Sequence, residues 1–157
     1  MEIKLFSNRP ESFEQFIDHS NALFCEDEYK NPEFPFFYPC GEKYLLIVAI
    51  DNNKEVLGGI QLSYTDDGWL IEGVDTGEDF ERPKWCMSCI GVHPKHQNKG
   101  VSKTLIAEQF NVMKKFGIDD ICQSSYTEDG MMRVMPIYRK YISENPDIRY
   151  LDFEREF

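Results

Sequence analysis

One stretch near the middle of the sequence changes its hydrophobic period within a few residues. Residues 84–92 alternate and are rich in small and apolar side chains, which predicts a strand buried on at least one face. His93 and Pro94 interrupt this pattern. From Gly100 onward, apolar residues recur near helical spacing until the basic residues and glycine at 114–117, a typical helix end. The sequence therefore predicts a buried strand, a tight turn and a helix, in that order.

The turn between the strand and the helix is suited to binding an anion. It reads Gln97-Asn98-Lys99-Gly100-Val101-Ser102, with little side-chain bulk at its glycine and serine. The first N–H groups of a helix have no intrahelical partner and carry the positive end of the helix dipole, so a phosphate can bind there without a dedicated side chain. Basic residues in and around the turn add positive potential: His93, Lys95, His96, Lys99 and Lys103.

This run resembles the acyl-CoA-binding segment of the GNAT N-acetyltransferase superfamily. In that family a buried strand ending in Val is followed by Gln/Arg-x-x-Gly-x-Gly/Ala, which opens a helix. Here Val92 ends the strand, Gln97 and Gly100 take the first two motif positions, and Ser102 departs from the usual Gly or Ala. Serine is small enough to allow the same backbone approach. The order of elements around the motif extends the resemblance over most of the chain.

The resemblance implies one GNAT-like domain over residues 1–157, with acetyl-CoA as acyl donor and a primary amine as acceptor in a direct, ternary-complex transfer. The expected fold is mixed α/β: a mixed, mostly antiparallel sheet of about six or seven strands, flanked by about four helices. The residues implied for the acyl-CoA are Ile90, Gly91, Val92, Gln97, Asn98, Lys99, Gly100, Val101 and Ser102. Two alternatives remain: a non-catalytic or regulatory acyl-CoA- or protein-binding module of the same fold, and an enzyme resembling acyl-homoserine-lactone synthases.

Tyr138 is the candidate catalytic residue. It resembles the tyrosine that many relatives place on this helix to protonate the departing CoA thiolate. Core packing is the alternative, because Tyr138 and Tyr141 share a helix face. The general base is less defined: where some relatives carry a glutamate on the central strand, this chain has Cys86, and a buried thiol is a poor base. The alternatives are water, Glu72, Asp75 and Glu81.

The rest of the chain divides into expected strands and helices. Before the central strand, the patterns predict a strand at 1–7, a helix over 13–24, a short helix and irregular loop within 25–38, strands at 44–51 and 56–64, and another strand at 69–74. Gly58 and Gly59 indicate a bulge or close backbone approach. After the central helix we expect a strand at 118–124, a helix over 128–143 that kinks or restarts at Pro136, and a strand at 149–157.

Charge is distributed unevenly along the chain, whose formal net charge is −11. Residues 1–81 hold 5 Lys and Arg against 18 Asp and Glu, whereas residues 82–157 hold 12 against 10. This acidic balance disfavours nucleic acid as a partner; the first part favours a cationic acceptor and the second an anionic cofactor. The candidate acceptor-binding residues are Glu26, Asp27, Glu28, Tyr29 and Glu72. Ordinary solubility is the alternative explanation of the acidic segments.

The five cysteines are scattered and odd in number, which favours reduced thiols. A zinc site built from Cys86-x-x-Cys89 and His93-x-x-His96 is disfavoured, because residues three apart on a strand point to opposite faces. No apolar run approaches the ~20 residues that span a bilayer, and the N-terminus lacks a signal-peptide core. We therefore expect a cytoplasmic monomer or homodimer without a metal or a membrane partner.

Overall fold

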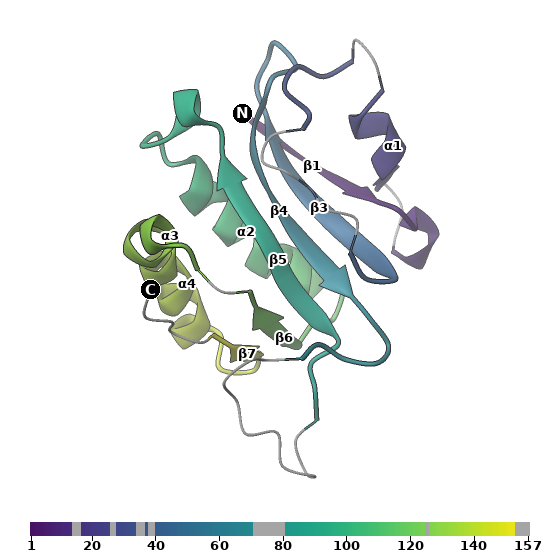
Figure 1. The fold of residues 1–157 in the computed structure, drawn as a ribbon, viewed down its shortest axis with the longest axis vertical. Coiled ribbons are helices and arrows are strands. Elements are labelled where there is room, and N and C mark those ends of the chain that lie inside the picture. Colours follow the sequence, from purple (N-terminus) through teal and green to yellow (C-terminus); the bar gives the residue numbers. More distant parts are fainter. Residues whose placement is uncertain are drawn as a thin grey trace.

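The computed structural model describes residues 1–13, 17–25, 28–33, 37, 40–70, 81–124 and 126–152. Its centre is a seven-stranded sheet in the order β2-β1-β3-β4-β5-β6-β7 (Figure 1). The strands are β1 (Glu2–Ser7), β2 (Asp18–His19), β3 (Lys43–Ile50), β4 (Val56–Tyr64), β5 (Trp85–Val92), β6 (Asp120–Gln123) and β7 (Arg149–Leu151). The helices are α1 (Ser20–Leu23), α2 (Val101–Lys115), α3 (Glu128–Arg133) and α4 (Met135–Glu144). The predicted mixed fold is confirmed.

The long strands β1, β3, β4 and β5 pair antiparallel, whereas the short strands β2, β6 and β7 each join a neighbour in parallel. The hairpin expected from the apolar runs before and after Asn52 is therefore present as β3 and β4. Gly58 and Gly59 allow close approach, as predicted. A Cβ at Gly58 would lie 2.7 Å from the Gly91 carbonyl oxygen, and one at Gly59 would lie 2.6 Å from the Phe37 ring.

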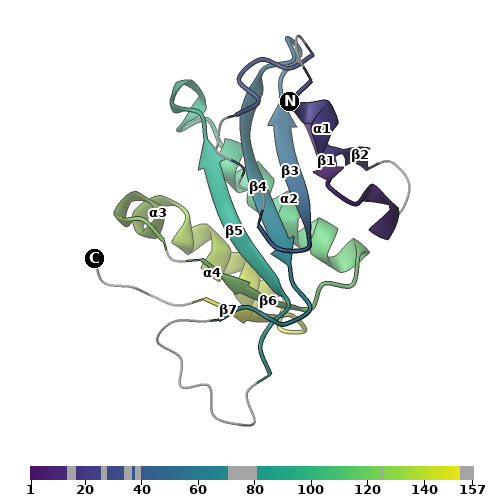
Figure 2. The same cartoon turned by 45° about the vertical axis from the view of Figure 1, so that its right-hand side comes forward.

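The sheet buries apolar side chains on both faces, because successive side chains of a strand point to opposite sides. One face packs against α2, which runs behind β3, β4 and β5 (Figure 2). The strand residues of this larger core include Leu45, Ile47, Ile60, Leu62 and Met87, and α2 contributes Leu105, Ile106, Phe110 and Met113. The other face holds a smaller cluster: Phe6, Leu23, Tyr29, Leu46, Val48, Ile50 and Val56. The continuous apolar runs of β3 and β4 are thus explained by two-sided burial.

The helix expected over 13–24 is present only at its end, as α1 (Ser20–Leu23), and is wrong for the described residues before it. A single 3-10 turn spans Pro10–Ser12, Phe13 is extended, and β2 pairs with the end of β1 before the four-residue α1 begins. The physical reason is tertiary: the Phe13 ring packs 5.3 Å from the Phe116 ring, and the strand pairing satisfies backbone groups that a helix would otherwise use. Residues 14–16 lie outside the described part.

Of the two alternatives at Pro136, the structure has the restart. α3 ends at Arg133, and Pro136 lies in the first turn of α4, where its missing N–H breaks no helical bond. The Thr127 side chain caps α3 by accepting a hydrogen bond from the Gly130 N–H at 3.1 Å. α3 and α4 pack against each other, and α4 also contacts α2 (Figure 1).

Three further expectations fall partly outside the described residues. The predicted final strand is present as β7, and residues 153–157 lie outside the described part. The described residues 28–33 contain no helix; instead Lys30 forms a β-bridge with Glu55. Trp69 and Leu70 are not in a strand, and residues 71–80 are not described. None of the helices within the described ranges has both the length and the apolar character needed to cross a membrane.

Candidate functional site

A cavity of about 670 Å³ lies where β5 ends and α2 begins. Its volume is in the range of small-molecule sites. Three segments line it: residues 87–92 of β5; the turn and start of α2 at 96–98 and 100–102; and the chain after β6 with α3, namely Ser124, Tyr126, Thr127, Asp129, Gly130, Arg133 and Val134. The third wall was not predicted, because nothing in the local sequence pattern of α3 places it opposite β5.

The cavity exists because β5 and β6 separate. The two strands pair only from Trp85 to Met87, and a hydrogen bond of 3.0 Å from the Ser124 N–H to the Met87 carbonyl follows as they part. Beyond this point, within the described residues, β5 is paired with β4 alone. One edge of the second half of β5 is therefore available to a ligand.

The ladder register decides which backbone groups of β5 face that edge. The His93 N–H donates to the Leu57 carbonyl at 2.8 Å, and hydrogen-bonded pairs alternate along an antiparallel ladder. The backbone groups of Ile90 and Val92 consequently point away from β4, toward the cavity. The Gln97 side-chain amide donates to the Val92 carbonyl at 3.2 Å, which leaves the two N–H groups and the Ile90 carbonyl for an extended ligand.

The start of α2 forms the second wall and has the form expected for an anion site. Gly100, the N-cap residue, has φ +80°, a conformation that glycine adopts without strain, and no side chain caps the helix. A Cβ there would meet no atom within 4 Å, so the backbone angle, rather than crowding by the protein, requires glycine. Arg133 from α3 reaches this turn: its guanidinium donates to the Asn98 side-chain oxygen at 3.3 Å and pairs with Asp129 at 3.0 Å.

The structure brings together all but one of the residues predicted for the acyl-CoA. Eight of them line the cavity: Ile90, Gly91, Val92, Gln97, Asn98, Gly100, Val101 and Ser102. Lys99 is exposed and does not belong to the lining. Their binding role stays a prediction, now with a defined geometry.

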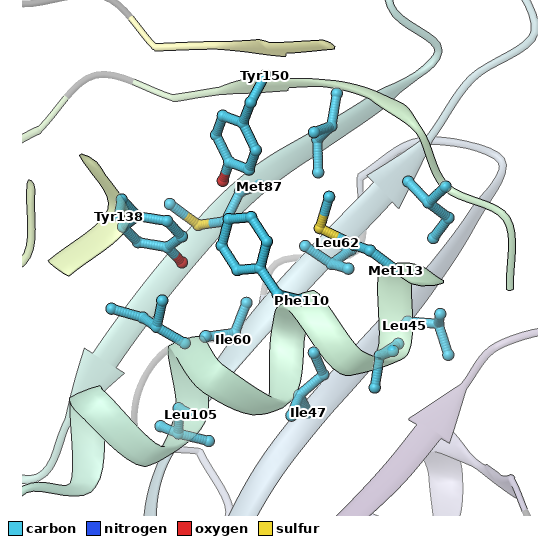
Figure 3. Packing of buried hydrophobic residues seen from close by; sticks show 14 of the residues in the cluster. Leu45, Ile47, Ile60, Leu62, Met87, Leu105, Phe110, Met113, Tyr138 and Tyr150 are labelled. Carbon is cyan, nitrogen blue, oxygen red and sulfur yellow. The ribbon is translucent and has the colours of Figure 1, made fainter. Parts of the chain in front are cut away.

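Tyr138 lies outside the cavity lining. Its side chain is fully buried, and its hydroxyl donates to the Gln109 side-chain oxygen at 2.5 Å. Figure 3 shows its ring grouped with those of Phe110 from α2 and Tyr150 from β7. Burial raises the pKa of Tyr138 well above its ordinary value. The catalytic role implied by the family resemblance stays a prediction, and the core-packing alternative describes its present surroundings.

The residues predicted for the acceptor are not grouped in the cavity. Glu28 is exposed and Tyr29 is buried in the smaller core, where its hydroxyl accepts a hydrogen bond from the Lys4 ammonium at 3.2 Å. Neither lines the cavity. Glu26, Asp27 and Glu72 lie outside the described residues, as does Asp75 among the candidate bases.

Cys86, the residue weighed above as a base, is buried next to Cys122 on the neighbouring strand. The Cys122 side chain and burial together raise the pKa of the Cys86 thiol far above its ordinary value. A thiol held protonated in this way does not serve as a general base. All five cysteines are free thiols, as the sequence predicts.

Sequence reasoning missed two polar features of the cavity. Ser88 is an extra residue in β5, because the pairing passes from Gln61 with Cys89 directly to Leu62 with Met87. The resulting β-bulge redirects the Ser88 side chain, which a strict alternation could not have predicted. The second feature is Tyr126, a buried lining residue whose hydroxyl has no hydrogen-bond partner within the described part of the chain.

Comparison with known proteins gives one family match and several structural likenesses. The BH1408 protein of Bacillus halodurans, as a tetramutant, is 15% identical, with 74% of this chain and 67% of that chain covered and a TM-score of 0.47. The aminoglycoside 6'-N-acetyltransferase AAC(6')-IG of Acinetobacter haemolyticus is 16% identical, with coverage of 73% and 67% and a TM-score of 0.43. AAC(6')-Iy, solved with a CoA bisubstrate analogue, is 18% identical, with coverage of 73% and 66% and a TM-score of 0.43.

No curated protein matches the chain. The family model described as "Acetyltransferase (GNAT) family" matches residues 9–141, which is most of the sequence and includes β5, the turn and α2. This match covers the elements that build the cavity. The chain belongs to the GNAT acetyltransferase family, and its enzyme class is therefore that of the acyltransferases.

Proposed function

We propose that this protein transfers an acetyl group from acetyl-CoA directly to a primary amine. The observation that carries the proposal is the open edge of β5, which leads from the uncapped start of α2 to the point where β5 and β6 separate. Such an edge offers an extended ligand both an anion site and backbone hydrogen bonds, the mode by which a strand is added to a sheet.

The cavity fits the parts of an acyl-CoA in sequence. The N–H groups at Gly100–Ser102 suit the pyrophosphate, and the N–H groups of Ile90 and Val92 suit the amide groups of the pantetheine arm. The strand from Val92 back to Ser88 spans ~13 Å at the usual rise per residue. This length would place the thioester near Ser88 and Cys89, beside the bulge.

Transfer then requires the amine nitrogen to attack the thioester carbonyl carbon while the C–S bond breaks and the electron pair stays on sulfur. The nitrogen loses one proton and the sulfur gains one. The chain's contribution is mainly orientation: backbone donors fixed in a strand hold the acyl group without reorganising during the reaction.

A non-catalytic acyl-CoA-binding module of the same fold is the second candidate. Two observations favour it: Tyr138 is outside the cavity with its hydroxyl bound to Gln109, and Cys86 is a buried thiol where some relatives carry a glutamate. Release of free thiol from acetyl-CoA in the presence of a panel of primary amines separates the two. An enzyme gives amine-dependent release, whereas a binding module gives none.

The binding half of the proposal is tested through Gly100. Acetyl-CoA should raise the Tm, because it binds the folded state. Gly100→Val should abolish this shift, since a β-branched residue disfavours the positive φ and places methyl groups against the phosphate. Ser102→Ala is the matched control and should keep the shift, because the proposed contact is through backbone N–H groups. Equal losses in both variants would contradict the proposed cradle.

We further propose a cationic acceptor, such as a polyamine, an aminoglycoside-like compound or the amine of a basic peptide. The support is the excess of acidic residues in the first 81 positions. For a polyamine, kcat/KM should fall as salt rises, because steering is screened over ~10 Å at 0.1 M ionic strength. Charge reversal at Glu26, Asp27 and Glu28 should flatten that dependence and leave acetyl-CoA binding unchanged. Preference for a neutral acceptor, independent of salt, would contradict this choice.

A further inference from the structure

A chain of short polar side chains leads from the cavity wall into the sheet and out toward the surface. The Ser88 hydroxyl oxygen lies 2.8 Å from that of Ser63, which lies 3.1 Å from the Cys40 sulfur. Ser88 lines the cavity, Ser63 is fully buried in β4, and Cys40 is partly exposed. The three groups thus connect the proposed reaction site with solvent.

The bulge in β5 is what completes this chain. Ser63 alternates with Leu62, so it lies on the face of β4 opposite α2. The extra residue in β5 brings the Ser88 hydroxyl to it, close to the cavity. A buried hydroxyl is destabilising unless it is hydrogen-bonded, and an apolar residue would fill this buried position near the end of β4 more favourably. Packing alone therefore gives no reason for a serine at this position.

The direction of the hydrogen bonds along this chain is reversible. Hydroxyl and thiol groups both donate and accept, so in each of the two links either atom can be the donor. Gln61 holds the chain in place: its side-chain amide donates to the Ser63 hydroxyl at 3.0 Å and to the Cys40 sulfur at 3.5 Å. Its backbone carbonyl, 3.3 Å from the Ser88 hydroxyl oxygen, is the alternative acceptor for the single proton of that hydroxyl. A proton entering at one end can therefore be passed on by exchange of donor and acceptor at each link.

Of the other titratable groups of the cavity lining, Tyr126 is held protonated, because burial raises the pKa of its hydroxyl. Asp129 pairs with Arg133 at 3.0 Å, and the His96 ring lies 3.4 Å from the Glu55 carboxylate. Cys89 is partly buried, and burial raises the pKa of its thiol. The acceptor nitrogen must nevertheless lose a proton when the amide forms.

We propose that Ser88, Ser63 and Cys40 form a relay that carries the proton of the acceptor nitrogen out of the cavity. The relay rests on the proposed acetyl transfer. As the N–C bond forms, the nitrogen gives a proton to Ser88, Ser88 gives its own to Ser63, and Ser63 gives its own to Cys40. The Cys40 thiol releases a proton to water, and the departing sulfur takes one up. No group is left with an altered charge, and rotation of the hydroxyls restores the starting arrangement.

The first test is kinetic. Ser88→Ala and Ser63→Ala should each lower kcat by ~10²-fold, the scale of general acid–base catalysis, with the KM for acetyl-CoA nearly unchanged. The double variant should be no slower than either single variant, because one broken link stops the relay. Ser88→Thr, which keeps the hydroxyl, should restore turnover. Ser143→Ala is the control, since that exposed serine donates to the Lys140 carbonyl of its own helix and lies outside the cavity lining.

The second test asks whether several protons move together. The dependence of kcat on the deuterium content of the solvent should be curved in the wild-type enzyme and linear in Ser88→Ala. Cys40→Ala provides a variant at the partly exposed end, in case Ser63→Ala does not fold, and it should show the same linear dependence with the same loss of turnover. A merely structural role for these residues would leave the curvature unchanged.

A third measurement needs no turnover. The infrared S–H band of Cys40, assigned by its loss in Cys40→Ala, should shift in Ser63→Ala and remain in Ser143→Ala. Normal turnover in the serine variants, additive effects in the double variant, or a linear wild-type dependence would each overturn the relay. These outcomes differ from failure of the proposed function, in which the wild-type protein itself releases no thiol from acetyl-CoA with any amine.

Discussion

Two sets of buried polar side chains in this protein differ in whether the direction of their hydrogen bonds can change. In the larger core, Gln109 accepts from the Tyr138 hydroxyl at 2.5 Å and donates to the Tyr150 hydroxyl at 3.1 Å. At the cavity, the Ser88 and Ser63 hydroxyls meet at 2.8 Å with either as donor. We call the first set the tyrosine cluster and the second, with Cys40, the serine chain.

The difference lies in the chemistry of the partners. An amide oxygen can only accept and an amide nitrogen can only donate, so both bonds of the tyrosine cluster have a fixed direction. Such bonds hold two helices and a strand in one arrangement, because Gln109 lies on α2, Tyr138 on α4 and Tyr150 on β7. In a hydrogen bond between two hydroxyls, donor and acceptor can exchange. A fixed donor and acceptor suit a stabilising role, and exchangeable ones suit proton transfer.

The largest effect expected from this comparison is on stability. Gln109→Leu keeps the side-chain size but leaves two buried tyrosine hydroxyls without that partner. At ~1–3 kcal/mol for each of the two unsatisfied groups, the free energy of unfolding should fall by about 2–6 kcal/mol. Denaturant titration measures this, with Ser88→Ala as the comparison, whose loss should stay below about 1.5 kcal/mol. Equal losses would remove the distinction between the two groups.

The next effect separates the two roles of Tyr138. Tyr138→Phe leaves the Gln109 oxygen unpaired, so the free energy of unfolding should fall by about 1–3 kcal/mol. If the hydroxyl also protonates the thiolate, kcat should fall by ~10² with acetyl-CoA affinity nearly unchanged. Tyr141→Phe is the control on the same helix. Normal turnover with reduced stability would assign Tyr138 to the core. Reduced turnover with unchanged stability would contradict the stabilising role given to the tyrosine cluster.

The smallest effect concerns alkaline pH. Burial raises the pKa of both Tyr138 and Tyr150, so above the ordinary tyrosine pKa of ~10 the unfolded chain loses protons that the folded protein retains. Their contribution to stability is thus complete below pH ~10 and declines above it, by about 1.4 kcal/mol per pH unit for each tyrosine. Tyr138→Phe should reduce this slope by one proton, whereas Ser88→Ala should not change it. Unfolding titrations between about pH 10 and pH 12 provide the measurement.

The sequence alone determined the elements in which local pattern and tertiary environment agree. The strand, turn and helix from Trp85 to Lys115 were predicted because both hydrophobic periods are strong, and Gly100 marks a backbone angle that other residues adopt only with strain. The same holds for the β3–β4 hairpin, whose two strands are continuous apolar runs. These features also located eight of the nine residues predicted for the acyl-CoA on the cavity wall.

Tertiary structure decided what depends on partners distant in sequence. The helical spacing after Phe13 gave way to a short parallel strand, because pairing with β1 and packing on Phe116 outweigh a weak local preference. The third wall of the cavity comes from α3, which meets the end of β5 only because β5 and β6 separate. The serine chain depends on one extra residue in a strand, and a bulge is defined by the register of two strands. The register of two paired strands depends on both segments. The hydrophobic period of one segment alone therefore cannot predict it.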